Sequence, residues 1–301
     1  MDSNILISIC TATYNRSELL PILYRSLEAQ TNTHFEWIVI DDGSTDTTAQ
    51  VLKGFEQNAS FPIRYYKQKN QGKHIAINTG VSKAKGTFFF IVDSDDRLPS
   101  DAIAILHKKI ASIKDNPDIA GVVGLKCYFN KQVVGSDSLH RDAICDIFDY
   151  RYIHKIQGDR AEVFKTTILK QYPFPKFEEE KFLPESIVWN RIGQQYQMLF
   201  FNENVYECEY LEDGLSAQSI TLRRKYPKGV MHLYAELGAV TKIGLVNRCK
   251  AHINFWRFFF CNRSHMLQHI QLLKKQYLAF VWIPLGMFFY LKDSLTQKKE
   301  L

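Results

Sequence analysis

Three aspartates follow a short apolar run, and their spacing points to metal chemistry. The apolar run is residues 88–92, and Asp93, Asp95 and Asp96 come immediately after it. A continuous apolar run of this length is typical of a strand buried on both faces, and unpaired carboxylates are too costly to bury with it. Close like charges repel unless a cation lies among them, and oxygen ligands suit Mg²⁺ or Mn²⁺. The pattern predicts a divalent-metal site, with a solvated strand end and a helix cap at Asp96 or Asp101 as the alternative.

Two earlier apolar runs end in polar clusters of the same kind. Residues 5–10 precede the cluster 11–16, and residues 35–40 precede the cluster 41–46. The carboxyl ends of parallel strands meet at one edge of a sheet, where open α/β folds bind their ligands. We therefore expect the three polar clusters to converge on a single crevice.

Apolar periodicity predicts strands and helices in alternation. Such alternation indicates an α/β fold with a doubly wound, mostly parallel sheet and right-handed crossovers. Ser17 is the expected N-cap of the first helix. The predicted strands are residues 5–10, 35–40, 63–67, 88–92, 119–125 and 198–208, and the helices between them are residues 18–27, 47–57, 70–84 and 101–114.

Composition and charge predict the number of domains, the cellular compartment and the charge of a partner. The 301 residues have room for one large domain, or for a domain with an appendage. The six cysteines are scattered without a C-x-x-C pair, which predicts a reducing compartment and no zinc site. The N-terminus lacks the pattern of a signal peptide, so a cytoplasmic location is expected. Residues 219–301 hold 14 Lys and Arg against three acidic residues, which predicts an anionic partner at this end.

Four ordered blocks resemble a known enzyme family. No G-x-x-x-x-G-K-[ST] or G-x-G-x-x-G motif follows the first strand, so a P-loop or dinucleotide site is unsupported. Residues 11–16, 40–46, 70–80 and 93–96 resemble the family 2 glycosyltransferases of the GT-A fold, and the resemblance extends to about residue 210. It implies a GT-A-type sheet and an inverting transfer from a nucleotide-diphosphate sugar, commonly a UDP-sugar, to an acceptor hydroxyl.

The resemblance also implies a role for individual residues. Asp42 would meet the base edge, Asp95 would lie near the ribose and sugar, and Asp96 would hold Mn²⁺ or Mg²⁺ at the diphosphate. Asp159 would contact the donor sugar, although a surface ion pair with Arg160 is an equal alternative. The implied donor-binding set is Thr11, Thr13, Tyr14, Arg16, Asp41, Asp42, Lys73, Asp95 and Asp159, and the implied metal ligands are Asp96 and Asp93.

An inverting transfer needs a carboxylate base that takes the acceptor proton. Family members often carry Glu-Asp at the start of a helix, with an Arg six residues later. Here Pro184 and Glu185 occupy those positions, and Arg191 lies six residues beyond Glu185. A helix N-terminus favours negative charge, which keeps such a carboxylate ionised. We predict Glu185 as the base, with Glu180 as the rival unless residues 178–180 form a solvated loop.

The C-terminal region reads as mostly helical. Residues 278–291 carry no charge, but as a helix they span about 21 Å, short of the roughly 30 Å hydrocarbon core. We therefore expect an interfacial segment within residues 255–299 rather than a membrane span; packing on the catalytic domain or on a second subunit is the alternative. The side chains expected to enter the leaflet are Trp282, Phe288, Phe289 and Tyr290, with Lys274, Lys275, Lys292, Lys298 and Lys299 at the headgroups.

These expectations combine into one interpretation. Residues 1–218 form the catalytic domain, with a nucleotide-sugar half at 1–126 and an acceptor half at 127–218, and residues 219–301 follow. The enzyme would lie at the inner face of the cell membrane and glycosylate a glycan or lipid-linked glycan for a surface polysaccharide. Nucleic acid is not expected as a partner, a homo-oligomer is left open, and residues 210–216 are either a lid or a turn. The alternatives are a sugar nucleotidyltransferase and a non-catalytic membrane-associated scaffold of the same fold.

Overall fold

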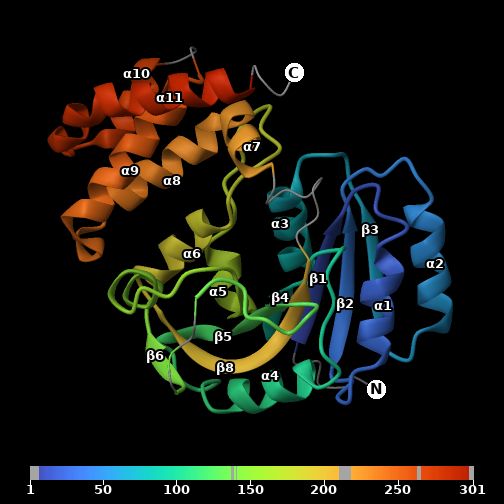
Figure 1. Ribbon diagram of the computed structural model, residues 1–301. Coiled ribbons are helices and arrows are strands. Elements are labelled where there is room, and N and C mark those ends of the chain that lie inside the picture. The colour runs from blue at the N-terminus through green and yellow to red at the C-terminus, as the bar shows by residue number, and fades with distance from the viewer. Residues whose placement is uncertain (1–6, 137–138, 140, 210–217, 263–265, 298–301) are drawn as a thin grey trace. The chain divides into compact units, whose positions relative to one another are not determined.

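The computed structural model describes residues 7–136, 139, 141–209, 218–262 and 266–297 (Figure 1). The predicted lid at residues 210–216, the first two residues of the first predicted strand, and Lys298 and Lys299 lie outside this part of the chain. The chain forms two compact units. The first is Met1–Phe174 with Arg191–Glu209, and the second is Pro175–Asn190 with Tyr210–Leu301, whereas the sequence analysis placed one boundary after residue 218.

The first unit is built on an eight-stranded sheet with the order β3-β2-β1-β4-β7-β5-β8-β6. The strands β3, β2, β1 and β4 are parallel to one another, and so are β5 and β8. The predicted α/β class with a mostly parallel sheet is confirmed. The bounds of the strands are Ile7–Thr13 (β1), Phe35–Asp41 (β2), Ile63–Lys67 (β3), Phe88–Ile91 (β4), Ile119–Tyr128 (β5), Ala143–Cys145 (β6), Arg160–Lys165 (β7) and Gln197–Cys208 (β8).

The strand β7 was not predicted, and it is antiparallel to both of its neighbours, β4 and β5. It has only six residues, four buried and two partly exposed without strict alternation, and such a short pattern does not reveal a strand direction. Gly121 of β5 permits the close approach, because a Cβ there would collide with the backbone of Val163 in β7. The antiparallel strand β7 therefore lies near the centre of the sheet, between the parallel strands β4 and β5.

Helices cover both faces of the sheet around the parallel half. The helix α1 (Leu20–Glu28) buries Leu23 and Tyr24 on the face that carries Trp37, and Tyr24 stacks on Phe55 of α2 (Thr48–Asn58) with ring centroids 4.0 Å apart. On the other face, Gly80 of α3 (Lys73–Lys83) lies against Cys10 of β1. The remaining described helices of this unit are α4 (Ala102–Ala111), the short π-helix η1 (Asp149–Ile153) and α5 (Thr166–Gln171), while α6 (Ser186–Gly193) runs from the second unit into the first.

The predicted N-cap at Ser17 is wrong. The helix α1 begins at Leu20, its N-cap position is Leu19, and no side chain caps it. Pro21 in the first turn needs no hydrogen bond for its nitrogen, so the helix can start there without a capping hydroxyl. The backbone N–H of Ser17 instead donates to Asp46, across the loops described below.

The second unit is helical, as predicted for the C-terminal extension. Its core gathers Val230, Phe255, Trp256, Phe258 and Ala279, and the indole N–H of Trp256 donates to the carbonyl of Ala279 at 2.7 Å. Figure 1 shows α8, α9 and α11 packed side by side. The elements are α7 (Ser219–Lys225), α8 (Pro227–Ala239), η2 (Thr241–Ile243), α9 (Gly244–Phe259), α10 (Met266–Ile270), η3 (Gln271–Leu273), η4 (Tyr277–Trp282) and α11 (Ile283–Gln297).

One described segment, Tyr277–Thr296, is long and apolar enough to cross a membrane, judged by length and composition alone. Of the four side chains predicted to enter a leaflet, Phe288 is 57% exposed, whereas Trp282, Phe289 and Tyr290 are partly buried. Trp282 packs against the core of the second unit, and Tyr290 lies against Phe260. Three of these four aromatic side chains are therefore partly covered by the second unit, Trp282 from η4 and Phe289 and Tyr290 from α11.

Candidate functional site

The loops after β1 and β2 are joined by hydrogen bonds. The N–H of Asn15 donates to the hydroxyl of Ser44 at 2.9 Å, and the N–H of Thr45 donates to Oδ1 of Asn15 at 2.8 Å. The N–H of Ser17 donates to a carboxylate oxygen of Asp46 at 3.1 Å. Asn15 has φ = 52°, a left-handed conformation that asparagine tolerates better than most residues. The first two predicted polar clusters therefore lie together.

Asp42 connects these loops to the segment that opens α3. Its Oδ1 accepts hydrogen bonds from the Gln68 amide at 2.8 Å and the Gln71 N–H at 2.9 Å, and its Oδ2 accepts from the Gly72 N–H at 2.7 Å. The residue is only 4% exposed. The carboxylate thus holds the loop that carries Lys73, and its predicted contact with a nucleotide base stays a prediction.

Thr11, Thr13 and Asp41 are buried at the ends of β1 and β2. The hydroxyl oxygen of Thr11 accepts from the Trp37 indole at 2.9 Å. Asp41 accepts from the Ser44 N–H at 2.7 Å and from the Tyr65 hydroxyl at 2.8 Å. The side chains of Thr11 and Asp41 therefore make buried hydrogen bonds that stabilise β1, β2 and the loop after β2. Of the other predicted donor-binding residues in the first cluster, Tyr14 is exposed and Arg16 is partly exposed.

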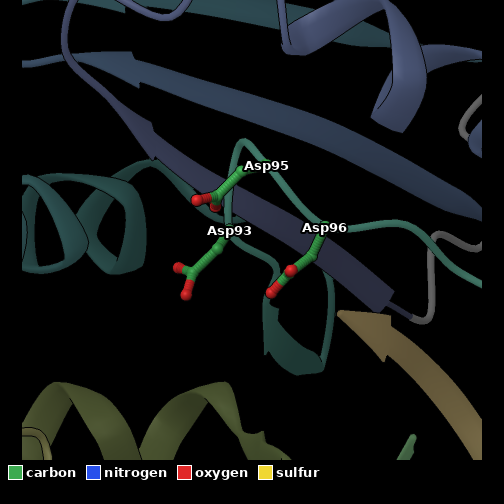
Figure 2. A group of neighbouring side chains, drawn as sticks. All are labelled: Asp93, Asp95 and Asp96. Carbon is green, nitrogen blue, oxygen red and sulfur yellow. The ribbon is translucent and has the colours of Figure 1, made fainter. Parts of the chain in front are cut away.

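The three aspartates lie on one loop directly after β4, with their carboxylates gathered on one side (Figure 2). Asp93, Asp95 and Asp96 each offer an oxygen within 4.8 Å of the others. Lys73, at the start of α3, approaches Asp93 with its Nζ 2.6 Å from Oδ1. The contact from Lys73 to Asp93 joins the third motif block to the fourth, so side-chain contacts link all four blocks in sequence.

The electrostatics of the cluster reflect crowded negative charge. Burial, together with the charge of Asp93, raises the pKa of Asp95. Burial raises the pKa of Asp96 to about 6 against the opposing charge of Lys126. Burial acts on Asp93 too, but Lys73 and Lys126 outweigh it and lower the pKa of this carboxyl. Lys73 and Lys126 thus lie among the three carboxylates, and the charge of Arg16 also opposes the rise in the pKa of Asp95.

The cluster fits a divalent cation. Mg²⁺ holds oxygen ligands at about 2.1 Å, so ligands on opposite sides of the ion are about 4.2 Å apart. Three carboxylate oxygens within 4.8 Å of one another are close to this spacing. A cation would also relieve the repulsion that helps to raise the pKa of Asp95 and Asp96. Hard oxygen donors suit Mg²⁺ and Mn²⁺ rather than a thiophilic metal.

Two residues that the sequence analysis missed hold Asp96 in place. The Tyr206 hydroxyl donates to Oδ2 of Asp96 at 2.7 Å and accepts the Asp93 N–H at 2.9 Å. Lys126 lies 3.2 Å from the same Oδ2 and 4.2 Å from the centre of the Tyr206 ring. Lys126 could have been found, because it is a single charge directly after the predicted strand at residues 119–125. Tyr206 lies within the predicted strand at residues 198–208, and no sequence motif marks it as a site residue.

Replacing Tyr206 by Phe is expected to weaken Mn²⁺ binding by about tenfold to a hundredfold, the usual effect of removing a hydrogen bond to a metal ligand. Asp96 would lose a donor and the Asp93 N–H would lose its acceptor. Isothermal titration with Mn²⁺ measures the change. The matched control is Tyr65→Phe, which removes a similar Tyr–Asp hydrogen bond at Asp41, outside the cluster. Equal affinities in the two variants would contradict this role for Tyr206.

The proposed surface pair of Asp159 and Arg160 is wrong. Arg160 is 5% exposed, and its guanidinium donates to the Tyr150 hydroxyl at 2.9 Å and to the carbonyl of Val134 at 2.7 Å. It also donates to the carbonyls of Ser136 and Asp159, so its contact with Asp159 is to the backbone. The Asp159 side chain is at the surface, and its contact with a donor sugar stays a prediction.

Glu180, the rival base, caps a helix within the second unit. Its Oε1 accepts the Lys228 N–H at 2.6 Å and its Oε2 accepts the Gly229 N–H at 2.8 Å, both in the first turn of α8. Burial raises the pKa of Glu180, and the two backbone hydrogen bonds oppose this. Glu180 is 7% exposed, so it does not lie in a solvated loop. Both oxygens are committed to satisfying the N-terminus of α8.

Glu185 lies directly before α6, at the helix start that the sequence predicted. Its carbonyl accepts the Val188 N–H at 2.9 Å and the Trp189 N–H at 3.3 Å, so the helical hydrogen bonds begin at this residue. Arg191 lies in the last turn of the same helix. A carboxylate here is favoured by the positive end of the helix dipole.

Curated glycosyltransferases are similar to this chain in sequence. A relative from Campylobacter jejuni, GalNAc(5)-diNAcBac-PP-undecaprenol beta-1,3-glucosyltransferase, is 29% identical over 61% of this chain and 58% of its own length. The chain spans only 32% of the length of another curated glycosyltransferase relative.

Solved structures share the fold. S. aureus TarS 1–349 in complex with UDP matches with a TM-score of 0.60 at 18% identity, over 97% of this chain and 92% of that one. The mannosyltransferase PcManGT from Pyrobaculum calidifontis, in complex with GDP-Man and Mn²⁺, matches with a TM-score of 0.60 at 16% identity, over 94% and 84%. Residues 8–186, more than half of the chain, match the family described as glycosyl transferase family 2. With its motif blocks joined at one edge of a sheet of this fold, the chain belongs to glycosyl transferase family 2.

Proposed function

We propose that this chain is an inverting glycosyltransferase that moves a sugar from a nucleotide-diphosphate sugar, a UDP-sugar, to an acceptor hydroxyl. The observation that carries the proposal is the series of contacts between the four motif blocks. It runs from Asn15 to Thr45, from Asp42 to Gly72 and from Lys73 to Asp93. Family membership and the UDP complex of TarS support the choice of donor.

The cluster of three aspartates would hold the donor diphosphate through a divalent cation. Asp96 and Asp93 would be the ligands, and Tyr206 and Lys126 would fix the orientation of Asp96. When bound, Mn²⁺ or Mg²⁺ neutralises the charge that develops on the diphosphate as the glycosidic bond breaks. The Mn²⁺ complex of PcManGT supports this assignment. Asp95 would lie near the ribose and sugar, and Lys73 beside the diphosphate.

Glu185 would act as the base. It takes the proton of the acceptor hydroxyl, the acceptor oxygen forms a bond to the anomeric carbon, and the bonding pair leaves with the diphosphate. Attack on the face opposite the leaving group inverts the anomeric configuration. Glu180 is the weaker candidate because two backbone N–H groups already occupy its oxygens.

The acceptor would be a glycan or lipid-linked glycan of a surface polysaccharide. The name of the C. jejuni relative, which specifies an undecaprenol-linked acceptor, supports this class. An acceptor of that kind lies at a membrane, and the apolar segment Tyr277–Thr296 is available for contact with one. The enzyme would therefore attach peripherally to the inner face of the cell membrane through residues 255–299.

The test is a donor panel assayed for two products. UDP-sugars and GDP-sugars are incubated with the protein and an extract of lipid-linked glycans, with and without Mn²⁺. We expect nucleoside diphosphate to be released only with Mn²⁺ and acceptor present. In a parallel incubation with sugar phosphates and nucleoside triphosphates, release of pyrophosphate would instead identify a nucleotidyltransferase. No turnover of any donor would support the non-catalytic scaffold.

A further inference from the structure

The helix α11 exposes a row of apolar side chains. Pro284, Phe288, Leu291 and Leu295 follow one another at the i, i+4, i+7, i+11 spacing of a single helix face, and all four are exposed. Phe288 is 57% exposed and Leu295 is 65% exposed. A soluble helix normally turns such a face to the protein core.

The acidic residue of α11, Asp293, faces the interior of the second unit. Asp293 accepts hydrogen bonds from Arg257 of α9 at 2.7 and 2.8 Å, and Arg224 of α7 lies 3.4 Å away. On the same side, Gly286 lies so close to Trp256 that a Cβ would collide with it. These contacts hold the rotation of the helix with the apolar row on its exposed side.

The short helix η4, directly before α11, also exposes apolar side chains. Leu278 and Val281 lie three residues apart in a 3₁₀ turn, where such residues share a side, and they are 61% and 68% exposed. Ala279 between them is fully buried in the core. We call Leu278, Val281, Leu285, Phe288, Leu291 and Leu295 the outward face.

The charges around the outward face are positive. Lys274 and Lys275 precede η4, Lys292 lies on the exposed side of α11, and all three are exposed. Within the described residues 266–297, Asp293 is the only acidic residue, and its two arginine partners lie inside the unit. A symmetric pairing of two copies through this face would bring these lysines together, which like-charge repulsion disfavours. Anionic lipid headgroups complement them.

We propose that the outward face docks into one leaflet of a bilayer that contains anionic lipids, with α11 lying in the plane of the interface. The segment Tyr277–Thr296 is long enough to cross a membrane, but one side of α11 packs on α9 through Gly286 and Asp293. We therefore place the helix along the interface, with only its outward face in the leaflet. The inference deepens the membrane attachment proposed above and rests on it, but not on the chemistry of transfer. It assigns insertion to aliphatic side chains and Phe288, whereas Trp282, Phe289 and Tyr290 are partly buried in the second unit.

The test is co-sedimentation of the protein with vesicles. We expect binding to vesicles of phosphatidylglycerol mixed with phosphatidylcholine, and weaker binding to phosphatidylcholine alone. The double variant Phe288→Ser, Leu291→Ser should reduce partitioning by more than about tenfold, because each side chain loses its transfer out of water. The matched control is Ile153→Ser in the first unit, since Ile153 is 60% exposed, like Phe288. It should bind as the unchanged protein does.

Further measurements distinguish an anionic membrane from a second copy of this chain as the partner of the outward face. Lys274→Gln with Lys275→Gln should lower binding to the anionic vesicles several-fold and leave binding to phosphatidylcholine unchanged. Unchanged binding by the Phe288→Ser, Leu291→Ser variant, or no vesicle binding by the unchanged protein, would overturn the proposal. So would a dimer, seen by sedimentation velocity, that this variant converts to a monomer. Because vesicle binding is read without turnover, failure of the donor assay leaves this result standing.

Discussion

Replacing Asp96 by Asn is expected to lower sugar transfer by about a thousandfold or more, because several kcal/mol of charge stabilisation would be lost. The side chain keeps its shape and can still accept from Tyr206, so the loop after β4 should stay folded. It loses its negative charge, which leaves Lys126 with a neutral partner at 3.2 Å. Mn²⁺ affinity should fall together with turnover. Isothermal titration and the rate of nucleoside diphosphate release measure the two effects.

The control for this change is Asp101→Asn. Asp101 follows a few residues later, is exposed, and makes no side-chain capping hydrogen bond at the start of α4. Its replacement should leave turnover and Mn²⁺ affinity within about twofold, as expected for an exposed surface change. Wild-type turnover by the Asp96→Asn variant, with unchanged thermal unfolding, would remove Asp96 from the site.

The sequence was sufficient to predict which blocks meet. A buried parallel strand must release its polar residues at its carboxyl end, and neighbouring parallel strands share that edge. The clusters after β1 and β2 and the aspartates after β4 obey this rule, and contacts between Asp42, Gly72, Lys73 and Asp93 complete the connection. The motif order and the sheet edge therefore follow from local patterns.

The partners of the motif residues could not be predicted in the same way. Tyr206 is 110 residues from Asp96, and its hydroxyl reaches the site because the next residue of β8, Glu207, exchanges backbone hydrogen bonds with Arg97. The antiparallel β7 separates β4 from β5, and its six residues contain no sign of direction. Contacts of this kind depend on strand order, which local periodicity does not contain.

The two glutamates illustrate the same limit. Glu180 and Glu185 both read as acidic residues near a predicted helix start. The function of Glu180 as a cap depends on α8, 48 residues further along the chain. On α11, likewise, the pairing of Asp293 with Arg257 decides which aromatic rings face inward. In both places, a long-range polar contact decides what a local pattern left open.

Glutamine variants of Glu185 and Glu180 are expected to differ in their effects on turnover and on stability. Glu185→Gln should lower kcat by about a hundredfold to ten-thousandfold, the range that general base catalysis supplies. Glutamine has nearly the same shape and can remain at the start of α6, so donor binding and thermal stability should be retained. The amide cannot take the acceptor proton, whereas metal and diphosphate contacts in the first unit are unaltered. Steady-state kinetics at saturating donor measure the change.

The matched variant Glu180→Gln removes the charge at the start of α8 and leaves one of the two N–H groups of Lys228 and Gly229 facing an amide nitrogen. It should destabilise the protein by about 1–2 kcal/mol, as the loss of a helix cap does, with little effect on kcat in the folded protein. Thermal unfolding and kinetics give both values for each variant. The opposite result, a stable Glu180→Gln variant without turnover beside an active Glu185→Gln variant, would move the base to Glu180. A side chain bonded to two backbone N–H groups would then have to leave its cap before it could accept a proton.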